Sequence, residues 1–236
     1  MNDSLEKSDI RKRHIRSYVR REGRMTVSQK RAMDVLWPRW GIDKKKQPVD
    51  IKELFGRSAT THLDVGFGSG DTLLAMASAL PQDNFVGIEV YRNGVAQVLK
   101  NCEEQQLNNV RVICEDAVEA LDHMLPAASM DRVYLYFPDP WHKKRHHKRR
   151  LVQTAFADRI ARVLKPGGEW LIATDWQNYA EHMLEVLNPH PAFDNLSPTG
   201  DFVPRHTTRP LTRFERRGQR LGHDVFDFTY RRRDPE

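Results

Sequence analysis

The chain has 236 residues, a formal net charge of +6, a mean hydropathy of -0.68 and two cysteines. No apolar run approaches the ~20 residues that a membrane-spanning helix needs, which argues against a membrane protein and for a cytoplasmic one. Cys102 and Cys114 show neither metal-ligand spacing nor the density of a disulfide scaffold. The length suits one domain with extensions around a single core.

The positive charge is clustered along the chain. Residues 11–24 hold seven Lys or Arg against one Glu, residues 143–150 hold six without an acid, and residues 205–220 hold six against one Glu. Three arginines follow at residues 231–233. Basic segments at both ends and in one internal loop indicate an anionic partner. The alternative for the N-terminal segment is a solvated, disordered tail.

Residues 1–58 are predicted to form a basic N-terminal arm that is partly disordered, followed by one domain at residues 59–236. The Trp-Pro-Arg-Trp sequence at 37–40 and the three lysines at 44–46 are expected to form turns and loops. A short apolar patch at residues 51–55 is the exception within the arm.

From residue 61 the pattern changes to short apolar runs that alternate with helical segments. The runs predict strands at 62–65, 85–90, 110–114, 132–137 and 170–174, and helices are predicted at 73–80, 94–106, 117–125, 151–164 and 179–187. Parallel strands need crossover connections, and helices supply them on both faces of a sheet. The predicted fold class is therefore α/β, a doubly wound and mostly parallel sheet of the Rossmann-like type.

The last part of the chain predicts one more strand. Residues 225–230 alternate between apolar and polar side chains and are expected to form a strand at an edge of the sheet. Residues 188–210 contain prolines and turn formers and predict a long irregular connection. A connection of that length in a compact domain usually carries a function.

A glycine-rich turn links the first predicted strand to the first predicted helix, with Asp64, Gly66, Gly68 and Gly70 at its key positions. Such glycines let a ligand lie close to the backbone, and the helix N-terminus offers free N–H groups. Compared with the dinucleotide fingerprint, the third glycine comes one residue early and an acid precedes the first, which argues against NAD. A plain strand-to-helix turn is the alternative.

Acids also lie at the ends of the next two predicted strands. Glu89 lies where a carboxylate can accept both ribose hydroxyls of an adenosine, and Asp116 lies where a side chain can reach an adenine amino group. Together with Asp64, these acids resemble the set found in class I S-adenosylmethionine-dependent methyltransferases. The resemblance implies that Asp64 and its glycines surround the methionine part, that Glu89 takes the ribose and that Asp116 lies by the adenine.

Residues 134–150 join an apolar strand, a carboxylate and a cationic run. Asp139 lies between two prolines, whose rings restrict the backbone and suit a positioned functional group. Trp141 offers a flat surface, and the cations at 143–150 are typical of phosphate binding. The alternative is a solvated loop with a structural Pro-Asp-Pro turn.

Four motifs resemble those of bacterial tRNA (guanine-N7-)-methyltransferases. They are Phe-Pro-Asp-Pro-Trp-His-Lys at 137–143, Arg-His-His-Lys-Arg-Arg at 145–150, Ala-Thr-Asp-Trp at 173–176 and Arg-Pro-Leu-Thr-Arg-Phe-Glu-Arg-Arg-Gly at 209–218. The resemblance runs from about residue 11 to the end of the chain and implies methylation of a guanine in the variable loop of tRNA. Asp64 stands where a Glu is also common in this family, and Arg213 where a Lys is also familiar.

The same resemblance implies roles for individual residues. It implies contact with S-adenosylmethionine at Asp64, Glu89, Asp116 and Asp139, with Asp139 also the catalytic residue. It implies substrate contact at Lys143, Asp175, Thr212, Arg213, Phe214 and Glu215. It implies RNA contact at Arg145, His146, His147, Lys148, Arg149 and Arg150.

The chemistry of guanine agrees with these roles. N7 keeps its lone pair at neutral pH and has no proton to lose, so attack on a sulfonium methyl group needs no general base. Catalysis then rests mainly on in-line positioning. Asp139 can orient the base and offset the positive charge that develops on the imidazole ring. Once the base is splayed out, Asp175 and Glu215 are suited to accept from guanine N1–H and N2–H₂.

Other functions stay open from the sequence. His142, His146 and His147 are candidate metal ligands, but the six cations around them repel a divalent ion, and no metal is expected. The loop at 137–141 also resembles that of methyltransferases acting on an exocyclic amine. A noncatalytic RNA-binding protein on a methyltransferase fold is a further alternative, which a binding measurement with S-adenosylmethionine tests. The sequence does not choose between a monomer and a homodimer.

Overall fold

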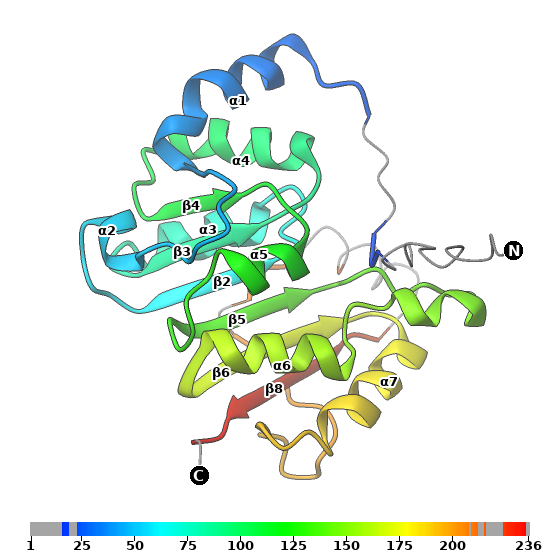
Figure 1. Ribbon diagram of the computed structural model, residues 1–236. Helices are drawn as coiled ribbons and strands as arrows, with labels where there is room; N and C mark the ends of the chain where they lie inside the picture. The colour runs from blue at the N-terminus through cyan, green and yellow to red at the C-terminus, as the bar shows by residue number, and fades with distance from the viewer. Residues whose placement is uncertain (1–15, 19–22, 208, 212–214, 216–223, 235–236) are drawn as a thin grey trace, which may run out of the picture.

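The computed structural model describes residues 16–18, 23–207, 209–211, 215 and 224–234, in which one sheet lies between two layers of helices (Figure 1). The strands are β1 (Gly41–Ile42), β2 (Thr61–Val65), β3 (Asn84–Ile88), β4 (Val110–Ile113), β5 (Met130–Tyr136), β6 (Leu164–Thr174), β7 (Phe193–Asn195) and β8 (Phe226–Arg232). The helices are α1 (Val27–Trp40), α2 (Ile51–Phe55), α3 (Asp71–Ala79), α4 (Arg92–Glu104), α5 (Ala117–His123), α6 (Thr154–Val163) and α7 (Gln177–Leu187), with a 3-10 helix η1 (Lys144–Arg149). None of these helices is long and apolar enough to cross a membrane.

The sheet has the strand order β1-β4-β3-β2-β5-β6-β8-β7. Its first six strands are parallel, whereas β8 is antiparallel to β6 and β7 is antiparallel to β8. The chain proceeds from β2 through β3 to β4 on one side and returns to the other side of β2 with β5 and β6. This arrangement confirms the predicted fold class. The strand order reverses between β2 and β5, and open α/β sheets bind ligands at the carboxyl ends of strands beside such a reversal.

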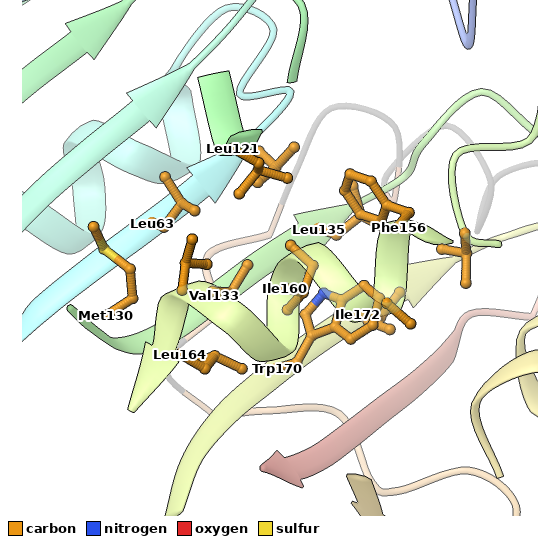
Figure 2. Close-up of a cluster of buried hydrophobic side chains, with 14 of the residues drawn as sticks. Leu63, Leu121, Met130, Val133, Leu135, Phe156, Ile160, Leu164, Trp170 and Ile172 are labelled. Carbon is orange, nitrogen blue, oxygen red and sulfur yellow. The ribbon is translucent and has the colours of Figure 1, made fainter. Parts of the chain in front are cut away.

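Two apolar clusters cover the two faces of the sheet. On β5, Val133 and Leu135 belong to one cluster and Tyr134 to the other, because successive side chains of a strand point to opposite faces. Helices α5, α6 and α7 pack on the first face, and α1, α3 and α4 pack on the second. In the first cluster, shown in Figure 2, Trp170 of β6 packs against Phe156 of α6 with ring centroids 6.0 Å apart.

The expectation of a turn at residues 37–40 was wrong, because these residues form the end of α1. Trp40 is 1% exposed, and its Nε1 donates to the backbone oxygen of Leu107 at 2.7 Å. Burial of this large side chain outweighs the helix-breaking signal of Pro38. The described part of the arm also adds β1 to the sheet beside β4. The division of the chain at residue 58 stays a prediction.

The expectation that the last strand lies at an edge was also wrong. β8 pairs with β6 on one side and with β7 on the other. β7 has three residues and β1 has two, and strands this short carry no alternation that a sequence pattern can reveal. β7 also interrupts the connection at residues 188–210, which was expected to be irregular throughout.

Gly70 tests how tightly the turn after β2 is packed. Its φ is +81°, and a Cβ added there would lie 2.0 Å from Cγ2 of Val98 on α4. Gly200, with φ +77° and no atom within 4 Å of an added Cβ, is the matched control. In urea unfolding, Gly200→Ala should lose about 1–2 kcal/mol from left-handed strain alone. Gly70→Ala should lose about 1–3 kcal/mol more from overpacking. Equal losses in the two variants would contradict the tight packing.

Candidate functional site

A cavity of about 630 Å³ lies at the carboxyl ends of β2, β3 and β5, beside the reversal of strand order. This volume is in the range of small-molecule sites. Its walls come from the turn after β2, from the residues that follow β3 and β4, from the loop after β5 and from the N-terminal residues Ser17 and Tyr18. Five predicted site residues line it, namely Asp64, Gly66, Gly68, Glu89 and Asp139.

Glu89 ties the turn after β2 to the end of β3. Its carboxylate accepts hydrogen bonds from the backbone N–H groups of Gly68 at 2.8 Å, Val90 at 2.7 Å and Tyr91 at 2.9 Å. Burial raises the pKa of Glu89, whereas these three donors act in the opposite direction. A carboxylate fixed in this way keeps further lone pairs for a ligand in the cavity.

Asp64 is the most unusual polar group of the cavity. Its side chain is buried, and its Oδ2 has no hydrogen-bond partner. Burial, and secondly the charge of Glu89, raise the pKa of Asp64 from 3.8 to about 7. A buried carboxylate oxygen without a partner destabilises the fold. A cationic ligand in the cavity would therefore offset the cost of burying Oδ2 of Asp64 without a partner.

Asp116 lies beside the cavity, between the two lining residues Glu115 and Ala117. Its Oδ1 accepts from the backbone N–H groups of Val118 at 2.8 Å and Glu119 at 3.4 Å and so caps α5. The adjacent Glu115 lines the cavity and forms an ion pair with Lys44. Sequence reasoning missed Glu115, although the signal that pointed to Asp116, an acid shortly after a strand, applied equally to it. Adenine contact by Asp116 stays a prediction.

The loop after β5 brings Asp139 to the cavity. Phe137 and Trp141 have φ of +53° and +48°, and Phe137 N–H donates to the backbone oxygen of Ala173 at 2.8 Å. Burial raises the pKa of Asp139, while the positive charge of Arg149 and then that of His142 act in the opposite direction. Asp139 is thus a partly buried carboxylate that faces both the cavity and the cationic segment.

Two arginines of the cationic segment point into the protein. Arg149 has its Cζ 3.9 Å from the ring centroid of Trp141 and donates to the backbone oxygens of Arg16 at 2.9 Å and Tyr18 at 2.8 Å. Arg150 is 3% exposed and donates to the backbone oxygen of Pro140 at 3.0 Å and to groups of Asn178. The buried donors of Arg150 hold the loop in place, and its contact with RNA stays a prediction.

The other residues of this segment face outward to different degrees. His146 and His147 are half-buried, and His146 packs edge-on against Trp141 with ring centroids 5.8 Å apart. The solvent-exposed cations are Lys143, Lys144, Arg145 and Lys148. These four side chains can reach a polyanion without disturbing the loop.

The predicted substrate contacts are dispersed. Asp175 directly follows β6 and is half-buried. Thr212, Arg213 and Phe214 lie outside the described residues. Glu215 is buried, with Oε1 2.7 Å from Nε of Arg205 and Oε2 2.6 Å from Nη1 of Arg209. Guanine contact by Glu215 stays a prediction, and its two oxygens already accept from arginines.

The cavity fits S-adenosylmethionine. The unpartnered Oδ2 of Asp64 suits the positively charged methionine end, and Glu89 offers acceptor positions for ribose hydroxyls. An added Cβ at Gly66 or Gly68 would meet no atom within 4 Å, so the backbone of this turn is open to a ligand. Among the described residues, no group of three or more His, Cys, Asp or Glu side chains is placed to hold a metal ion.

Comparison with known proteins identifies relatives of this chain. A family described as putative methyltransferase matches residues 58–228. The tRNA (guanine-N(7)-)-methyltransferase of Serratia proteamaculans (strain 568) is 54% identical over 222 residues, covering 94% of this chain and 93% of that protein. The protein of the same name from Sodalis glossinidius (strain morsitans) is 53% identical over 218 residues, covering 92% and 91%.

Solved structures with a similar fold include the 16S rRNA methyltransferase KamB, with a TM-score of 0.57 and 14% identity over 83% of this chain and 99% of that one. The aminoglycoside resistance methyltransferase NpmB1 has a TM-score of 0.52 and 17% identity over 77% and 91%. These neighbours share the fold of this chain, and the family that matches residues 58–228 makes the chain a methyltransferase. At more than half identity over nearly all of its length, the chain belongs to the tRNA (guanine-N(7)-)-methyltransferase family.

Asp64→Asn should flatten the pH dependence of stability without ligand. Between pH 4 and 7 the folded state holds a proton on Asp64 that the unfolded state has lost, so the free energy of unfolding falls as the pH rises. The asparagine variant lacks this contribution. In urea unfolding, the decrease in its free energy of unfolding from pH 5 to 7 should therefore be smaller than in the parent by roughly 2 kcal/mol. Calorimetry at pH 7.5 should show at least about tenfold weaker binding of S-adenosylmethionine. Parallel stability curves for both proteins would contradict the raised pKa.

Proposed function

We propose that this chain transfers the methyl group of S-adenosylmethionine to N7 of a guanine in the variable loop of tRNA, acting in the cytoplasm. The observation that carries the proposal is the position of Asp139, which lines the cavity and lies a few residues before the exposed cations of η1. A small cationic ligand and a polyanion can therefore meet at this carboxylate. The names of the relatives give the same reaction and substrate.

When bound, S-adenosylmethionine would supply an electrophilic methyl group, to which N7 donates its lone pair while the carbon–sulfur bonding pair stays with the sulfur. Guanine N7 gives up no proton in this transfer, so the site requires no general base. The ring gains positive charge instead, and the carboxylate of Asp139 at the cavity wall can stabilise that charge. Its second task is to hold the base in line with the methyl group, where positioning lowers the barrier.

Asp175 is the acceptor that we assign to the Watson–Crick edge of the guanine. It follows β6, the strand next to β5, so Asp175 and Asp139 lie after neighbouring strands at the same edge of the sheet. Glu215, the other expected acceptor, pairs with Arg205 and Arg209. His142 and Trp176 form an edge-on ring contact between the same two loops, with centroids 4.1 Å apart.

The direct test incubates the protein with unmodified tRNA and labelled S-adenosylmethionine and then identifies the methylated nucleoside. The proposal expects 7-methylguanosine at a single position of the variable loop. A labelled methyl group on an exocyclic amine would instead support the alternative function, an amine methyltransferase that acts on RNA. Binding of both ligands without transfer would support an RNA-binding protein.

Asp139→Asn should keep the fold and a hydrogen-bonding group but lose the negative charge that acts in the transition state. The single-turnover rate constant at saturating ligands should fall by about 10²-fold, with tRNA affinity changed less than about threefold. Asp194→Asn, at an exposed ion pair with Arg233, is the matched control and should turn over like the parent. If Asp139→Asn turns over like the parent as well, charge at this position is dispensable.

Arg145 and Lys148 test the docking of RNA. Replacing both by Gln should weaken tRNA binding and reduce the slope of log K against log salt by about 1–2, because fewer counterions are released. The control replaces Arg132 and Lys165 by Gln, which removes the same charge near the amino ends of β5 and β6. Cofactor affinity should be unchanged in both double variants. An unchanged salt slope in the first would show that this segment is only a solvated surface.

A further inference from the structure

A buried ion network lies behind the wall of the cavity. Arg209 is 1% exposed, and its Nε and Nη2 donate to Oδ1 and Oδ2 of Asp227 at 3.2 and 2.9 Å. Its Nη1 donates to Oε2 of Glu215 at 2.6 Å, and Arg205 donates to the other oxygen of Glu215 at 2.7 Å. Three hydrogen bonds to two carboxylates fix the orientation of the guanidinium. Removal of one partner would leave an uncompensated buried charge.

The same guanidinium packs on the two aromatic residues that lead into the loop of Asp139. The Cζ of Arg209 is 5.5 Å from the ring centroid of Tyr136 and 5.6 Å from that of Phe137. Tyr136 and Phe137 also line the cavity. Arginine favours such positions because its planar cation stacks on rings while its edge donates hydrogen bonds. Arg209 therefore supports the wall from the side of β8.

Phe137 needs that support because its backbone is strained. Its φ of +53° is uncommon for a bulky residue, and such a conformation persists only where the surroundings fix it. Its N–H donates to the backbone oxygen of Ala173, and Ala173 pairs with Asp227 across β6 and β8. Asp227, which binds Arg209, thus lies opposite Ala173, which binds Phe137. Asp139 follows only two positions later in the chain.

We propose that Arg209, held by Asp227, is a positioning residue for methyl transfer, which fixes the turn at Phe137 and thereby places the carboxylate of Asp139. This inference rests on the proposed function of Asp139. Arg209 does not touch the reacting atoms in this role. It acts through Phe137, so its loss should affect the rate of the chemical step more than the binding of either ligand.

A lysine at this position cannot replace the arginine. Its single ammonium group keeps the charge but cannot span Asp227 and Glu215 in a planar fork while lying against two rings. Arg209→Lys therefore separates geometry from charge. Asp227→Asn is the second variant, because it keeps side-chain volume and Arg209 itself but weakens the contact that orients the guanidinium. Arg132→Lys, in the ion pair with Glu169 near the start of β5, is the matched control.

The experiment compares these three variants with the parent at a temperature where circular dichroism shows all of them folded. Single-turnover methylation is measured with saturating tRNA and S-adenosylmethionine, and the affinity for each ligand is measured separately. Arg209→Lys and Asp227→Asn should lower the rate constant by about 10–100-fold, which corresponds to a small misplacement of a catalytic group. Both affinities should change less than about threefold, and the control should match the parent.

Three results would overturn the inference. Rates within about threefold of the parent would show that Asp139 is placed without Arg209. Losses of rate and of both affinities in equal measure would point to general damage to the fold. Failure of both variants to fold at any temperature would assign Arg209 to stability alone. A parent that methylates no tRNA would instead refute the proposed function, which keeps the two hypotheses separate.

Discussion

The position of β2 at the centre of the sheet is the constraint on which the site depends. All five of its residues are buried, because β3 and β5 pair with it on either side and helices cover both faces. The crossovers from β2 to β3 and from β5 to β6 leave the carboxyl ends of these neighbouring strands in opposite directions, and the cavity lies there. Asp64, the next-to-last residue of β2, is consequently buried.

The electrostatics of the site separate two ligands of opposite charge. The interior of the cavity presents carboxylates, with Asp64 unpartnered at Oδ2 and Glu89 held by backbone donors. The exposed cations of η1 lie outside it. Interactions are strong in the buried interior and screened by salt at the surface. A small cation is therefore favoured inside and a polyanion outside, with Asp139 at the boundary between them.

The basic segments of the chain divide into structural and solvent-facing residues. Arg149, Arg150 and Arg209 donate to protein groups in the interior or at its border, whereas Arg145 and Lys148 face solvent. A guanidinium has five donors in a fixed plane, so it can join several backbone and carboxylate groups at once. The number of cations in a segment therefore overstates the number that can contact phosphate.

The sequence by itself determined the parallel sheet, the glycine turn with Asp64, the acid at Glu89 and the loop of Asp139, because each depends on a local pattern or on spacing along the chain. It also indicated the family, because the distinctive motifs are continuous stretches of sequence that can be read without the structure. Only the tertiary structure decided the pairing of β7 outside β8, the burial of Arg150 and the network of Arg209 with Asp227. These features arise between segments distant in the chain, where burial and hydrogen-bond geometry override what a residue's charge alone suggests.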